Sequence, residues 1–180
     1  MRILGNQDEA RYHQAVADEC HGMAWDLIEQ IELSPEDTAR LAQLASAALY
    51  HRKFFGRASG NAHATLLFAW AMARCGAGEV ALQAGQQALE FFEGNLSKDW
   101  ERAFAHAAMA TACHAAVDVE GYMHHYQTAH RLMQRLRQDE AGNFMAAFRT
   151  VPSFPPAELV QDEDDLEYED DCEDGDDQAA

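Results

Sequence analysis

Cationic residues are scarce in this sequence. Its 13 lysines and arginines stand against 31 aspartates and glutamates, so the formal net charge is −18. Proteins that bind nucleic acid or anionic lipid gain affinity when Lys and Arg release counterions, whereas an acidic chain is repelled. We therefore expect no nucleic-acid partner.

Long apolar runs are also missing. No window approaches the ~18 uninterrupted apolar residues of a membrane span. The N-terminal residues MRILGNQDEARYH lack the apolar core of a signal peptide. The four cysteines are widely spaced and form no CxxC pair, which favours free thiols in a reducing compartment over a disulfide framework. We expect a cytoplasmic protein without a membrane partner.

Metal-binding and catalytic motifs are absent although there are nine histidines. No HExxH or His-x-x-x-His pair occurs, and the adjacent His124 and His125 diverge by roughly 100° on a helix. Cys113 and His114 diverge in the same way, and His106 lies about 10 Å along the axis from Cys113. A partner for Cys113 on another helix stays open. We expect no metal, no cofactor and no catalytic residue.

The stretch from 61 to 93 is the most informative part of the chain. Two apolar helical runs flank a Gly76–Ala–Gly78 break, with Gly76 where a helix C-cap needs positive φ. So short a connection predicts an antiparallel helical hairpin. Ala81 and Ala88 lie two turns apart on one face, where small side chains let two helices approach closely.

A weaker copy of this hairpin follows. Helical runs over 98–116 and 119–136, with Asp118 as the N-cap between them, align with the first hairpin at an offset of 41 residues. In that alignment Val117 replaces Gly76, and Tyr122 replaces Ala81. The period is within the range of helical-hairpin repeats.

These residues resemble the tetratricopeptide repeat family. The likeness rests on the small-residue spacing of Ala69, Gly76, Ala81 and Ala88, and on Tyr126 as the aromatic of the second hairpin. The proline that normally ends each unit is missing from both hairpins. Trp70, the Ala-rich second helix and Asp99–Trp100 also resemble an uncharacterised family of bacterial helical proteins, which implies no activity. The repeat resemblance implies a non-catalytic scaffold that binds peptides or proteins.

The rest of the chain predicts one helical domain over 1–150. A first helix runs to about Leu33, and Ser34–Pro35 begins a second that ends at Gly56. Ser97 is the expected N-cap after Gly94. Asp139–Gly142 breaks the last long helix, and residues 143–149 form a short cap. We expect an all-α array of stacked antiparallel hairpins.

Residues 151–180 form a Pro-containing linker and an acidic tail. Of the 31 acidic residues, 13 lie between 158 and 177, which predicts disorder. The tail could be only solubilising, could bind weak divalent cations, or could dock a basic partner through Leu166 and Tyr168. It could also fold back onto Arg74, Arg102 or Arg131.

Candidate binding residues come from one face of the array. His63, Trp70 and Arg74 share a face of one helix, and His51 lies on the helix before it. If that face is concave, an exposed Trp70 between His and Arg would anchor an acidic peptide; otherwise Trp70 is core and Arg74 a solvated charge. His106 completes the candidate set.

We therefore predict a protein-interaction module that is not an enzyme and binds through a concave helical face, the acidic tail, or both. The alternative is a helical bundle that binds a metal or small molecule, where several of His51, His63, His106 and His114 converge on an enclosed polar pocket. A third alternative is a homo-oligomer that pairs through an exposed Ala-rich face.

Overall fold

The computed structural model describes residues 6–153. This part forms seven helices and no strand: α1 (Asn6–Ile28), α2 (Pro35–Arg52), α3 (Ala58–Arg74), α4 (Gly78–Gly94), α5 (Asp99–Ala115), α6 (Val119–Met133) and α7 (Gln138–Phe148). The all-α prediction is confirmed. None of these helices has the length and apolarity to cross a membrane. The tail with Leu166 and Tyr168 lies outside the described residues.

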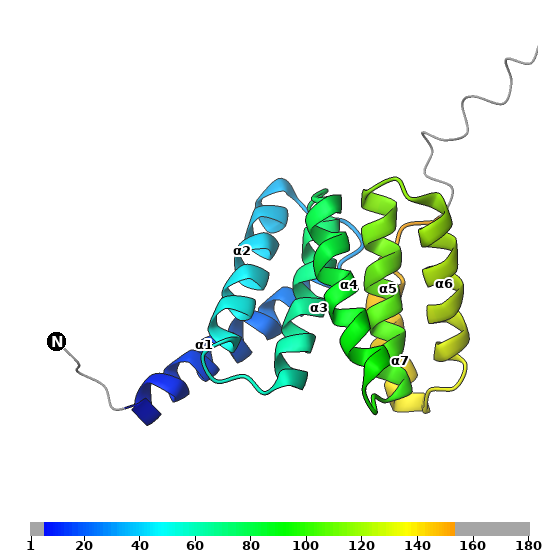
Figure 1. Ribbon diagram of the computed structural model, residues 1–180. Helices are drawn as coiled ribbons and strands as arrows, with labels where there is room; N and C mark the ends of the chain where they lie inside the picture. The colour runs from blue at the N-terminus through cyan, green and yellow to red at the C-terminus, as the bar shows by residue number, and fades with distance from the viewer. Residues whose placement is uncertain (1–5, 154–180) are drawn as a thin grey trace, which may run out of the picture.

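Figure 1 shows α2 to α6 stacked side by side in chain order, with α7 behind α5. Consecutive helices pair as α1 with α2, α3 with α4 and α5 with α6, and the pairs meet where α2 contacts α3 and α4 contacts α5. The odd-numbered helices also contact one another in series, from α1 through α3 and α5 to α7. They make one continuous layer, and this layer carries the candidate site.

Small side chains let the helices pack closely. Ala81 and Ala88 are 0% and 1% exposed, as their spacing predicted. Trp70, Phe92 and Phe144 are fully buried and fill the space between the pairs. Because these alanines are buried inside the chain's own core, they offer no exposed face for self-association. Homo-oligomerisation stays a prediction without that support.

Two helix starts follow the predicted capping chemistry. Ser34 Oγ accepts the amide of Asp37 at 3.0 Å, with Pro35 at the first helical position. Asp118 Oδ1 accepts the amide of Gly121 at 2.9 Å. The start at Ser97 was wrong, since Lys98 is the N-cap.

Other helix ends differ from prediction. α1 ends at Ile28 instead of Leu33, and α2 ends at Arg52 instead of Gly56. The acidic stretch after Gln138 begins α7 instead of breaking a helix, since acids favour a helix N-terminus. Val151, which follows α7, is buried.

The turns of the central hairpin and its copy have the same geometry. Gly76 has φ 78°, and Val117, 41 residues later, has φ 59°. In the first turn the amide of Ala77 donates to the carbonyl of Met72 at 2.9 Å. In the second turn the amide of Asp118 donates to the carbonyl of Cys113 at 2.8 Å, again five residues earlier. The backbone therefore repeats where the sequence alignment placed the repeat, even though the glycine does not.

Val117 should be strained where Gly76 is not. A left-handed conformation costs a residue with a Cβ roughly 1–2 kcal/mol, so Val117→Gly should raise the free energy of unfolding by about 0.5–1 kcal/mol after the added chain entropy of glycine. Gly76→Val should lower it by about 1–2 kcal/mol, because a Cβ there has no neighbour within 4 Å and only the backbone matters. Urea denaturation of both variants checks this, and equal effects of the same sign would contradict it.

Candidate binding cavity

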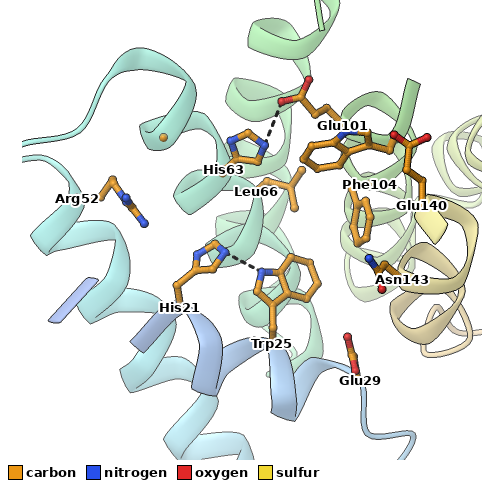
Figure 2. Close-up of a pocket in the computed structure, with 12 residues that line it drawn as sticks. His21, Trp25, Glu29, Arg52, His63, Leu66, Glu101, Phe104, Glu140 and Asn143 are labelled. Carbon is orange, nitrogen blue, oxygen red and sulfur yellow. Dashed lines mark hydrogen bonds and ion pairs between the residues drawn. The ribbon is translucent and has the colours of Figure 1, made fainter. Parts of the chain in front are cut away.

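A cavity of about 560 Å³ opens on the layer of odd-numbered helices. Each helix of that layer contributes side chains three or four residues apart, which is the spacing of one helical face. Its lining residues are His21, Trp25 and Glu29 from α1 and the turn after it, Arg52 from α2, Gly60, His63 and Leu66 from α3, Trp100, Glu101 and Phe104 from α5, and Glu140 and Asn143 from α7. Figure 2 shows the labelled side chains of this set arranged around a common space.

Aromatic rings form the walls of the cavity. Phe104 meets Trp25 at a centroid distance of 5.6 Å and an angle of 81°, and it meets Trp100 at 6.2 Å and 86°. Edge-to-face contacts of this kind are favourable and fix the rings relative to one another. The three rings therefore form a right-angled corner, contributed by α1 and α5.

His21 is held in one neutral tautomer at the edge of this corner. The indole nitrogen Nε1 of Trp25 donates to His21 Nε2 at 2.9 Å (Figure 2). Burial, with the nearby charge of Arg52, lowers the pKa of His21 to about 4. At neutral pH the proton therefore resides on Nδ1, which is buried and has no hydrogen-bond partner in the described part of the chain.

His63 links α3 to α5. Its Nδ1 lies 2.8 Å from the carbonyl oxygen of Ser59, to which it can only donate. Its Nε2 lies 3.2 Å from the carboxylate of Glu101, an ion pair when the imidazole is protonated (Figure 2). The ring also stacks on Trp100 at 5.6 Å and 26°. These contacts fix one rim of the cavity.

The predicted anchor Trp70 is not at the surface. It is 0% exposed and packs behind the wall, 5.7 Å from Trp25. Of the two interpretations of Trp70, the exposed anchor was wrong and the core residue is confirmed, because its face of α3 is covered by α1 and α5. Trp25 and Trp100 hold the surface position instead.

The second predicted anchor, Arg74, has a structural role. Its guanidinium donates to the carbonyls of Ile28 at 2.8 Å, Gln30 at 2.6 Å and Ile31 at 3.1 Å. The carbonyl of Ile28 is one that the end of α1 leaves without a helical partner, and Gln30 and Ile31 lie in the connection that follows. Arg74 is therefore committed to capping α1 and is not presented to a ligand.

The other predicted histidines lie apart from the cavity. His51 contacts His13 between α1 and α2, with their Nδ1 atoms 2.8 Å apart. His106 contacts His125 between α5 and α6 at 2.9 Å, and its Nε2 is 3.1 Å from Glu93. Burial lowers the pKa of His106 and brings that of His125 to about 4.

The convergence that the metal or small-molecule alternative required is therefore not found. Of the four histidines that it named, only His63 lines the cavity, and His114 lies beside Tyr122, 6.0 Å between ring centroids. Within residues 6–153, no group of three or more His, Cys, Asp and Glu side chains is arranged to hold a metal ion.

Sequence reasoning missed Trp25 and Trp100 as site residues. His21, Trp25 and Glu29 recur every four residues, a polar–aromatic–polar stripe on one face of a helix. Trp100 and Phe104 repeat that spacing on α5. A helix face that packs in the core is apolar throughout, whereas this one mixes polar and aromatic residues. That difference is the sequence feature that could have indicated Trp25 and Trp100 as site residues.

No family model, curated protein or solved structure matches this chain. The account of its function therefore depends on the cavity itself. Chemically, that cavity combines an aromatic corner with carboxylates, one guanidinium and two imidazoles, which suits reversible binding of a side chain or small molecule.

Proposed function

We propose that this protein is a non-catalytic interaction module that binds a peptide segment of a partner protein in the cavity of its odd-helix layer. The observation that carries the proposal is the joint construction of that cavity by α1, α3, α5 and α7. A surface made by several stacked hairpins suits an extended ligand, because each hairpin contributes one row of contacts.

We further propose that the stack is of the tetratricopeptide type. Support comes from the repeated turn at Gly76 and Val117 and from the pairing of consecutive helices. In such arrays the first helix of each hairpin lines the concave surface, and here those are α1, α3 and α5. The acidic tail, with Leu166 and Tyr168, stays a predicted second contact for the partner.

The chemistry of Cys113 favours binding over catalysis. The thiol is 1% exposed, and burial raises its pKa to about 12. A nucleophilic cysteine needs a lowered pKa, since the thiolate is the reactive form. The strongest nucleophile candidate in the sequence is therefore an inert part of the core.

A second candidate function is the binding of a free small molecule. The volume of about 560 Å³ falls within the roughly 300–1,000 Å³ typical of such sites. A peptide side chain and a free small molecule would contact the same lining residues. The two candidate functions therefore differ only in the ligand.

Selection from a displayed library of random peptides tests the proposal. We expect selected peptides to bind the full chain, and Trp100→Ala to weaken them at least tenfold, because a Trp at a buried contact is typically a binding hot spot. The matched control is His130→Ala on the exposed side of α6, which should leave affinity unchanged. Circular dichroism verifies that both variants fold. Selected peptides that bind Trp100→Ala as well as the wild type would contradict the proposal.

A further inference from the structure

The charges around the cavity are unbalanced. Three carboxylates line it, those of Glu29, Glu101 and Glu140, against the single guanidinium of Arg52. That guanidinium is already paired, with its Nη2 2.8 Å from Asp18 Oδ1. His21 adds no charge near neutral pH. The lining itself therefore carries more carboxylates than guanidinium groups.

Of the three carboxylates, that of Glu29 has no side-chain partner in the described part of the chain. Glu101 accepts a backbone amide at 2.8 Å and lies 3.2 Å from an imidazole nitrogen, and Glu140 lies 3.3 Å from the guanidinium of Arg137. No hydrogen bond or ion pair joins the Glu29 carboxylate to another residue in the described part of the chain, while the guanidinium of Arg149 donates to the backbone carbonyl of Glu29 at 3.2 Å. Figure 2 shows it on the side of Trp25 that faces Asn143. A half-buried carboxylate without a side-chain partner can accept a charge-assisted hydrogen bond from an incoming cation.

The aromatic rings of the cavity also favour a cationic ligand. Aromatic faces carry negative potential, and a cation placed over them is attracted, more strongly when it is desolvated. Trp25, Trp100 and Phe104 all line the same cavity, and Phe104 meets each of the two indoles at nearly a right angle. A cation in that space would meet more than one ring, whereas an anion would meet their negative potential.

We propose that the cavity binds the cationic side chain of a lysine or arginine in a basic segment of the partner, with its charge held between the aromatic corner and Glu29. This inference rests on the proposed function and adds the chemistry of the ligand. The net charge of −18 supports it, because an acidic chain attracts a basic segment from a distance and repels an acidic one.

Four short peptides test the inference. Acetylated and amidated pentapeptides are compared by NMR titration of the full chain, and they differ only in a central lysine, arginine, norleucine or glutamate. We expect the lysine and arginine peptides to bind about tenfold more tightly than the norleucine peptide. The glutamate peptide should bind most weakly, and the preference should shrink as salt is added.

Two charge-removing variants test whether the preference for the lysine peptide depends on Glu29. Glu29→Gln should reduce the lysine-over-norleucine ratio by about threefold or more, since it removes the unpaired charge without changing shape. Glu32→Gln makes the same charge change at an exposed position outside the cavity and should leave the ratio unchanged. Both substitutions are isosteric at the surface, so neither is expected to unfold the protein.

The outcomes separate this inference from the proposed function. Equal binding of the lysine and norleucine peptides, or preference for glutamate, overturns the cation inference. Failure of all four peptides overturns it too. In each of these cases the proposed function still holds if library-selected peptides lose affinity with Trp100→Ala, and it fails if they do not. Preferential binding of free cationic molecules over the same group in a peptide would favour the small-molecule alternative.

Discussion

Replacement of Trp70 by alanine should lower the free energy of unfolding by about 3–5 kcal/mol, which is the usual cost of removing a large core aromatic. Trp70 is 0% exposed and packs against Trp25 and Phe104, so its loss leaves a cavity where α1, α3 and α5 meet. Urea denaturation followed by circular dichroism measures the change as a lower midpoint at unchanged slope.

Two controls separate packing from hydrogen bonding and from surface effects. Trp70→Phe should cost much less, since it keeps an aromatic ring and removes an indole N–H that is buried without a partner within the described residues. Trp100→Ala should also cost less, because that ring is only half-buried. A Trp70→Ala variant as stable as Trp100→Ala would show that Trp70 is not the core residue that the structure makes it.

Replacement of Arg74 by methionine should be the next most damaging change, at about 2–3 kcal/mol. The substitution keeps the aliphatic length but removes the charged donors that bind the carbonyls of Ile28, Gln30 and Ile31. Hydrogen bonds from charged groups contribute more than neutral ones, and the freed carbonyl of Ile28 would be left without its partner. Amide hydrogen exchange just after α1 should accelerate together with the loss of stability.

Arg131→Met is the matched control for that variant. Arg131 also lies in the last turn of a helix, but it is exposed and its guanidinium donates only to Thr128 in the described structure. We expect a change within about 0.5 kcal/mol, as for most surface substitutions. If Arg74→Met were equally mild, the cap on α1 would not be a stabilising contact.

Helix pairing was predictable because it depends on local patterns. Ala81 and Ala88 mark a close seam, Gly76 marks a turn, and Ser34 and Asp118 mark helix starts, each through its own short-range chemistry. The repeat was found even at Val117, where the turn conformation persists without the glycine that favours it.

The cavity was less predictable because it depends on how helices face one another. The sequence alone could not decide whether the aromatic of α3 or those of α1 and α5 would reach the surface, since all lie on amphipathic or apolar faces. Packing placed Trp70 inside and left Trp25 and Trp100 to line the cavity. Arg74 was similarly misread, because its acceptors are more than 40 residues away in the chain.

The three tryptophans provide the most direct test of where binding occurs. In a titration of 15N-labelled protein with a library-selected peptide, the indole signals of Trp25 and Trp100 should shift most, and that of the buried Trp70 least. The Trp25 signal should respond because its N–H is held by His21 at the cavity edge. Peptide binding that leaves both cavity indoles unchanged while it shifts amides of α4 and α6 would place the interaction on the opposite layer and contradict the account.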